Sequence, residues 1–158
     1  MRSVVAVPPG SERLTPSVNG MQVSRGLEGV AFSASSVVTI GTFDGMHLGH
    51  MAIIAELLGR TPVPGGRSVV VTFDPHPRGV VGDVPVGLLT TIDERIGLLR
   101  RAGIDLVTVV DFTFEFSRQP ASTFFEQYVI RGTGVAEVVV GDDHMFGRDR
   151  EASIDTLR

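Results

Sequence analysis

Four apolar runs, each rich in β-branched residues, constrain the fold of this chain more than any other feature. They span residues 37–40, 68–73, 106–110 and 137–140. Each run is continuous and does not alternate between apolar and polar positions, which is typical of strands buried on both faces. Strands of this kind belong to parallel sheets that carry helices on both sides.

Helical patterns separate the runs. Residues 51–59 carry apolar side chains at helical spacing and end in glycine. Thr91 and Glu94 have the spacing of a capping box, and the helix that they open is expected to end at Gly103. A shorter helix is expected over about residues 121–132. This alternation predicts an α/β fold, a Rossmann-like doubly wound parallel sheet.

The composition narrows the classes of function. The net charge of −4 argues against a general nucleic-acid binder, and the absence of cysteine excludes disulfides, thiolate metal sites and a cysteine nucleophile. The run Val4–Val7 is too short for a signal-peptide core, and no later run reaches membrane-spanning length, so we expect a cytoplasmic protein without a membrane partner. Residues 1–20 are rich in proline and glycine, which predicts a disordered extension before a domain over 21–158.

Glycine, aspartate and histidine gather where the predicted strands end. The segments that follow the four runs are 41–44, 74–77, 111–112 and 141–143. In open parallel sheets, ligands bind beyond the carboxyl ends of the strands. The sequence therefore predicts a ligand site along this edge of the sheet.

The segment Gly41–His50 joins the first run to its helix. His47 and His50 are three residues apart, so they share a face in the first helical turn. Free backbone N–H groups and the positive end of the helix dipole favour an anion there, and two imidazoles add donors. Gly49 lets a ligand approach the backbone. The pattern predicts a site for the phosphates of a nucleotide.

Simpler interpretations exist for the two histidines and for the charged residues of the predicted helices. Two histidines near a helix start can also act as caps or lie in solvent, whereas a zinc site would need a third ligand at standard spacing. Placement directly after a buried strand favours the phosphate site. The charges of Asp93, Glu94 and Arg95, like the pair at 100–101, are expected on exposed helix faces.

Gly41-Thr42-Phe43-Asp44-Gly45 followed by His47-Leu48-Gly49-His50 resembles the signature of the HxGH nucleotidyltransferase superfamily. More narrowly, the chain resembles the adenylyltransferase (FAD synthetase) domain of the bacterial bifunctional riboflavin kinase/FMN adenylyltransferase family over about 21–158. That resemblance rests on Thr72-Phe73-Asp74-Pro75-His76-Pro77, Leu89-Thr90-Thr91, Val140-Gly141-Asp142-Asp143 and Phe146-Gly147, with Met21-Gln22-Val23 similar to the opening strand. It departs at His144-Met145, where the family often has Phe-Arg.

The resemblance implies transfer of AMP from ATP to FMN, which yields FAD and pyrophosphate and uses Mg²⁺. It implies His47 and His50 as catalytic residues. The implied ATP-binding residues are Gly41, Thr42, Phe43, Asp44, His47, Gly49 and His50. The implied flavin-binding residues are Asp74, Pro75, His76, Pro77, Asp142, Asp143, Phe146, Arg148 and Arg150, and Asp143 is also the candidate Mg²⁺ ligand.

The sequence leaves several alternatives open. The acceptor can be another phosphorylated molecule, such as phosphopantetheine or nicotinamide mononucleotide, or the chain can be a catalytically silent nucleotide- or flavin-binding module. Residues 74–77 can be a rigid turn without a role in binding, and residues 142–143 can form an Asx-turn at the end of a strand. Arg148 and Arg150 can lie in solvent. The superfamily's later Ser/Thr-rich element and the riboflavin kinase domain are not found, so the domain is expected to be incomplete at its C-terminus. No pattern favours a particular oligomeric state.

Overall fold

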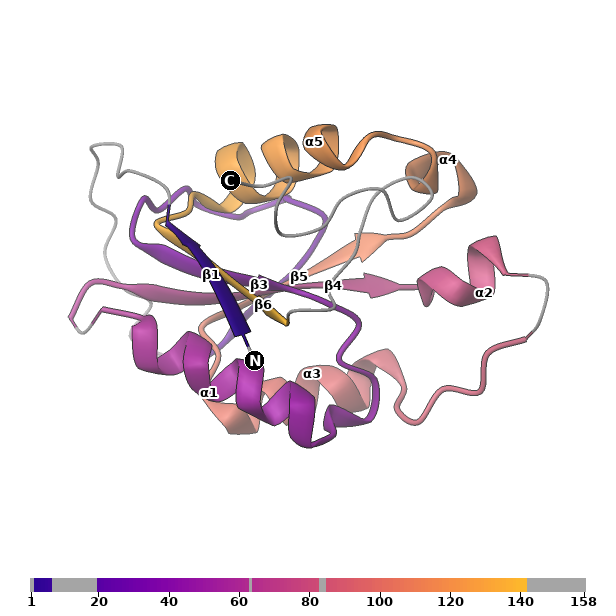
Figure 1. Cartoon of the computed structure of the whole chain (residues 1–158), viewed down its shortest axis with the longest axis horizontal. Coiled ribbons are helices and arrows are strands. Elements are labelled where there is room, and N and C mark those ends of the chain that lie inside the picture. Colours follow the sequence, from indigo (N-terminus) through magenta and orange to yellow (C-terminus); the bar gives the residue numbers. More distant parts are fainter. Residues whose placement is uncertain (1, 7–19, 63, 83–84, 142–158) are drawn as a thin grey trace.

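The computed structural model describes residues 2–6, 20–62, 64–82 and 85–141. These residues form a six-stranded sheet in the order β1-β6-β3-β4-β5-β2 (Figure 1). The strands from β6 to β2 run parallel to one another, and β1 is antiparallel to β6. Their bounds are β1 Arg2–Ala6, β2 Gln22–Arg25, β3 Ser36–Ile40, β4 Arg67–Asp74, β5 Leu106–Asp111 and β6 Glu137–Gly141.

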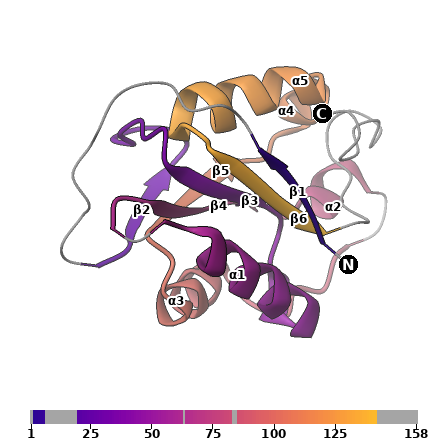
Figure 2. The same cartoon turned by 60° about the vertical axis from the view of Figure 1, so that its left-hand side comes forward.

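Helices cover both faces of the sheet. Two longer helices, α1 (Leu48–Arg60) and α3 (Ile92–Ala102), lie on one face (Figures 1 and 2). The other face carries α4 (Phe114–Ser117), α5 (Ala121–Phe124) and the π-helix η2 (Phe125–Thr133). Two short elements follow strand ends: the 3-10 helix η1 (Asp44–Met46) after β3, and α2 (Pro77–Val81) after β4.

The strands divide the core between the two faces. Val69 and Val71 belong to a buried cluster with Phe124 and Val129 of the second face. Val70, between them, belongs to a separate cluster that includes Leu57 of α1 and Leu99 of α3. Because side chains alternate along a strand, a continuous apolar run supplies both clusters. The predicted doubly wound, Rossmann-like α/β class is confirmed.

The helix ends lie at or within one residue of the positions that the capping residues and glycines predicted. In α3, the Thr91 hydroxyl accepts from the Glu94 N–H, the Glu94 carboxylate accepts from the Thr91 N–H at 2.7 Å, and Gly103 takes the left-handed conformation (φ 94°), as predicted. Helix α1 runs one residue past Gly59, because the N–H and hydroxyl of Thr61 both donate to the Leu57 carbonyl.

The N-terminal segment differs from the prediction. Residues 1–20 were expected to be disordered, but residues 2–6 form β1 and pair with β6. The physical reason is that the outer edge of β6 offers backbone donors and acceptors, and the β-branched pair Val4-Val5 suits a strand. Residues 7–19 lie outside the described part of the chain.

Candidate functional site

The turn between β3 and α1 is built from residues in the left-handed conformation. Phe43 (φ 51°), Gly45 (φ 74°) and Met46 (φ 44°) adopt it in close succession. The Phe43 side chain is 1% exposed and belongs to the buried cluster with Leu57, so the core holds this backbone in place. A Cβ on Gly41 would lie 3.1 Å from Cε2 of the Phe43 ring, and a Cβ on Gly45 would lie 2.7 Å from Cδ1 of Leu89, so a side chain at either position would require its neighbour to shift.

The two histidines meet at the start of α1. His47 is the N-cap residue, and its Nδ1 accepts a hydrogen bond from the His50 N–H at 3.3 Å. The two rings stack with their centroids 3.6 Å apart, so the prediction that they share a face is confirmed. His47 is exposed and His50 is half-buried, so the pair lies at the surface of the domain.

Gly49 is required by the histidine beside it. A Cβ at this position would lie 3.0 Å from Cε1 and 3.2 Å from Nδ1 of His47. These contacts are tighter than ordinary van der Waals distances, so a side chain would push the imidazole away from the helix. The sequence pattern predicted this glycine for the close approach of a ligand, and the structure adds the His47 ring as a neighbour within the protein.

His50 is held in its neutral form. Burial lowers its pKa to about 4, and the neighbouring His47 and the charge of Arg95 act in the same direction, while Asp44 opposes them. Its ring centroid lies 5.1 Å from that of Phe43. The Nδ1 atom is buried, and no hydrogen-bond partner for it exists among the described residues.

The first turn of α1 leaves backbone donors open. The His50 N–H is used by His47, and the Met51 N–H donates to the His47 carbonyl at 3.0 Å. For the N–H groups of Leu48 and Gly49, the described part of the chain offers no acceptor. Two free N–H groups, the positive end of a 13-residue helix and two imidazoles therefore converge on one surface, which is an arrangement suited to an anion.

Asp44 holds the turn to the segment before α3. Its carboxylate accepts hydrogen bonds from the Leu89 N–H at 3.0 Å and from the Thr90 N–H and hydroxyl, each at 2.8 Å. Burial opposes its ionisation, but these hydrogen bonds and the charge of Arg95 outweigh burial and lower its pKa. This carboxylate, predicted to bind ATP, is thus already engaged by the protein.

The segment Asp74–Pro77 runs from the last residue of β4 to the first residue of α2. Asp74 forms an ion pair with Arg25 of β2 at 3.2 Å. His76 is the N-cap of α2 and accepts from the Arg78 N–H at 3.1 Å. Burial lowers the pKa of His76, Arg95 and Arg78 act in the same direction, and Asp44 opposes them.

Arg95 was predicted on an exposed face of α3, and this prediction is wrong. Its side chain is 2% exposed, and Nη1 donates to the Thr72 hydroxyl at 3.3 Å and to the Phe73 carbonyl at 3.1 Å. A signal was present in the sequence, because Ile92, Arg95 and Leu99 are spaced as one helix face. Arg95 occupies a position on the apolar face of α3, and that face is the one the helix buries.

Several predicted site residues lie outside the described part of the chain: Asp142, Asp143, Phe146, Arg148 and Arg150. They follow Gly141, which ends β6 beside β3. Within the described ranges, no group of three histidine, aspartate or glutamate side chains is placed to hold a metal ion.

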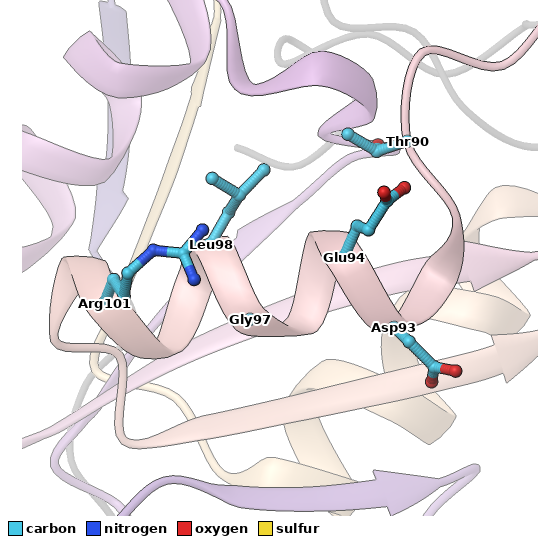
Figure 3. A pocket seen from close by; sticks show the side chains of 6 residues that line it. All are labelled: Thr90, Asp93, Glu94, Gly97, Leu98 and Arg101. Carbon is cyan, nitrogen blue, oxygen red and sulfur yellow. The ribbon is translucent and has the colours of Figure 1, made fainter.

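A groove of about 510 Å³ runs along the outer side of α3 (Figure 3). Figure 3 shows Glu94 pointing toward Thr90, and Arg101 beside Leu98. The lining of the groove contains no residue of Gly41–His50, although Thr90 of the lining also forms hydrogen bonds with the η1 turn.

Of the helices that the structure describes, none has the length and apolar character to cross a membrane.

The doubly wound sheet and the histidine pair at its first strand-to-helix junction define the class, an α/β domain with a candidate anion site beyond the carboxyl end of a central strand. The family model described as FAD synthetase matches residues 30–158. The chain therefore belongs to the FAD synthetase family.

Curated relatives agree with this membership. The chain is 36% identical over 145 residues to the bifunctional riboflavin kinase/FMN adenylyltransferase of Pseudomonas fluorescens, covering 87% of this chain and 45% of that protein. It is 33% identical over 125 residues to the protein of the same name from Listeria monocytogenes, covering 78% and 40%. The chain thus spans less than half the length of these curated relatives.

A crystal structure titled macrolide-efflux protein from Streptococcus pneumoniae has the same fold. Its TM-score is 0.70 at 24% identity, and the match covers 87% of this chain and 45% of that one.

Proposed function

We propose that this chain carries an FMN adenylyltransferase site, which transfers AMP from ATP to FMN and releases FAD and pyrophosphate. The observation that carries the proposal is the stacked pair of His47 and His50 beside the open N–H groups of α1. Membership of the FAD synthetase family and the names of the relatives support the choice of nucleotide and acceptor.

The histidine geometry suits binding of the triphosphate. Because Nδ1 of His47 accepts a backbone N–H, the neutral ring carries its proton on Nε2 and donates from there. His50, with its low pKa, takes part as a neutral imidazole. Together with the helix N-terminus, the pair would stabilise charge on the phosphoryl oxygens.

The reaction itself requires no enzyme nucleophile. An oxygen of the FMN phosphate attacks the α-phosphorus of ATP in line. The bond from that phosphorus to the bridging oxygen then breaks, and pyrophosphate leaves with the electron pair. Positioning and charge stabilisation are what such a transfer asks of a protein.

FMN would bind next to the phosphate site. Asp74 is the last residue of β4, the strand adjacent to β3, and His76 follows it. The charge of Asp44 at the phosphate turn acts on the pKa of His76. The segment with Asp142, Asp143, Phe146, Arg148 and Arg150 continues from β6, the strand on the other side of β3. Both neighbours of the histidine turn thus lead into segments proposed to contact flavin.

Mg²⁺ is proposed to enter with ATP. In sites of phosphoryl transfer the ion is bound mainly by phosphate oxygens and water, with one or two carboxylates from the protein. The described residues form no three-ligand cluster, a donor set that fits an ion carried by the nucleotide, and Asp143 is the candidate carboxylate. When bound, the ion would neutralise charge on the phosphates. We also propose a cytoplasmic location, where both substrates are found.

A product assay tests the proposed function. The chain is incubated with ATP, Mg²⁺ and FMN, and FAD is separated by HPLC while pyrophosphate is measured in parallel. We expect both products, and we expect His47→Ala or His50→Ala to lower kcat by roughly 100- to 1,000-fold, since each removes a donor to the developing charge. His47→Gln, which keeps an amide donor, is expected to lose less.

The same assay separates the alternatives. Formation of an adenylylated product from phosphopantetheine or nicotinamide mononucleotide, but not from FMN, would reassign the acceptor. Calorimetric binding of ATP without release of pyrophosphate at high protein concentration would show a silent binding module. Unchanged ATP binding in the double variant His47→Ala/His50→Ala would contradict the proposed phosphate site.

A further inference from the structure

Arg95 stands out among the buried residues. Of the buried polar side chains in the described part of the chain, it is the one that carries a charge, and it is 2% exposed. The described residues provide no carboxylate within ion-pair distance, and its Nε has no hydrogen-bond partner among them. A buried charge is unfavourable unless the surrounding structure uses it.

The hydrogen bonds of Arg95 lead to the turn that carries the histidines. Nη1 donates to the Thr72 hydroxyl and to the Phe73 carbonyl, near the end of β4. The Thr72 hydroxyl in turn donates to the Thr42 carbonyl at 3.1 Å. Thr42 lies two residues beyond the end of β3 and leads into η1, so this chain of bonds connects α3 through β4 to the start of the turn.

A second connection joins α3 to the same turn. Asp44 of η1 accepts the N–H groups of Leu89 and Thr90, and the next residue, Thr91, is the N-cap of α3. The Thr90 hydroxyl also accepts the Gly45 N–H at 3.1 Å. The turn before His47 is therefore attached to α3 on two sides.

The charge of Arg95 acts on side chains at both strand ends. It interacts favourably with Asp44 and Asp74. It is one of the influences that lower the pKa of His50, after burial and His47 and against Asp44. It also contributes to the lowered pKa of His76, after burial and together with Arg78, again against Asp44.

We propose that Arg95 is a positioning residue for the phosphate site, which fixes the ends of β3 and β4 relative to each other and supplies a permanent positive charge beneath the histidine turn. The proposal rests on the proposed function, in which that turn binds ATP. A fixed cation in a partly dry environment attracts a polyanion and needs no rearrangement when the polyanion binds. The hydrogen bonds from Arg95 through Thr72 to the Thr42 carbonyl fix the position of the turn relative to β4.

Three substitutions on α3 test the role of the charge. Arg95→Gln removes the charge but keeps an N–H donor, Arg95→Lys keeps the charge, and Arg100→Gln removes an exposed arginine of the same helix as a control. ATP affinity is measured by calorimetry at fixed ionic strength, and the pKa values of His50 and His76 are measured by NMR. We expect Arg95→Gln to weaken ATP binding by roughly 10- to 100-fold and to raise both pKa values. Arg95→Lys is expected to retain most of both properties.

A second pair of variants covers the case in which Arg95→Gln does not fold. Thr72→Val breaks the chain of hydrogen bonds, whereas Thr108→Val changes a buried threonine of β5 whose hydroxyl has no partner among the described residues. We expect Thr72→Val to weaken ATP binding and Thr108→Val to leave it unchanged.

Two results would overturn the proposal: a folded Arg95→Gln protein that binds ATP as tightly as Arg100→Gln, or equal ATP affinity in the Thr72→Val and Thr108→Val proteins. Absence of ATP binding to the unmodified chain would instead reject the proposed function. In that case the NMR measurement of the His50 and His76 pKa values, which does not depend on nucleotide binding, still shows whether the charge of Arg95 acts on the turn.

Discussion

Gly49 shows how closely single residues are fitted in the histidine turn. A methyl group on its Cα would lie only 3.0 Å from Cε1 of the His47 ring, so the ring would have to shift. At the other end of α1, an added Cβ at Gly59 would meet nothing within 4 Å. The same substitution at these two positions therefore separates a local effect on the site from a general effect on the helix.

We expect Gly49→Ala to leave the free energy of unfolding nearly unchanged and to lower FAD formation by roughly 10- to 100-fold, because the methyl group displaces the imidazole. Gly59→Ala is expected to stabilise the protein by about 0.5–1 kcal/mol, the helical advantage of alanine, with unchanged activity. Urea unfolding and the HPLC assay measure the two quantities. Full activity in Gly49→Ala would mean that the His47 ring position is not needed.

At this scale the sequence foretold the histidine pair but not its supports. The spacing of His47 and His50 is local, so their shared face could be predicted. The hydrogen bonds between Asp44 and Thr90 join residues far apart in the chain, and no local pattern announces them. Roles of the predicted site residues in binding ATP and flavin stay predictions.

Among the elements, α3 connects the core to the site. It places Leu99 in the core, Arg95 under the strand ends and Thr91 next to the segment that Asp44 holds. Its capping box satisfies N–H groups at both the N-cap and the third helical position.

We expect Thr91→Ala to reduce the free energy of unfolding by about 1 kcal/mol, because the Glu94 N–H loses its acceptor at the helix start. In a protein of this size the change lowers Tm by roughly 2–4 °C. Calorimetry measures it, and Thr91→Ser, which keeps a hydroxyl, is the matched control. Equal Tm values for both variants would show that the cap contributes little.

Long buried strands and capped helices were predictable from the sequence, whereas short elements were not. The runs of β3 to β6 have a composition that only a doubly covered sheet can bury. Helices α2 and α4 are too short for a helical period to show, and they depend on N-cap side chains, His76 and Thr113. The π-helix η2 continues α5 without any distinct pattern in the sequence.

For the whole molecule, the low pKa of His50 connects stability to pH. In the folded protein that pKa is about 4, and on unfolding it returns to 6.5. Between these values the unfolded chain binds a proton that the folded protein does not bind. The contribution of the neutral ring is therefore complete above pH 6.5 and is lost as the pH falls toward 4.

We expect this loss to be on the order of 1 kcal/mol, because the half-exposed ring keeps part of its solvation. Urea unfolding at pH 7 and pH 4.5 measures it, with His50→Gln as the comparison, since this variant does not titrate at that position. The variant should lose less stability between the two pH values. An identical loss in both proteins would show that other groups cause it.

The strand pairing has a consequence for how the chain folds during synthesis. Gln22 in β2 pairs with Leu106 in β5, and Arg2 in β1 pairs with Gly141 in β6. Strands β1 and β2 precede β3, α1 and β4 in the chain, and their partners follow these three elements, so β3, α1 and β4 can associate before β1 and β2 are paired. Such distant pairings close large loops and slow folding. Nascent chains therefore expose β1 and β2 without partners until β6 and β5 have been synthesised, which is the period when a chaperone would bind them.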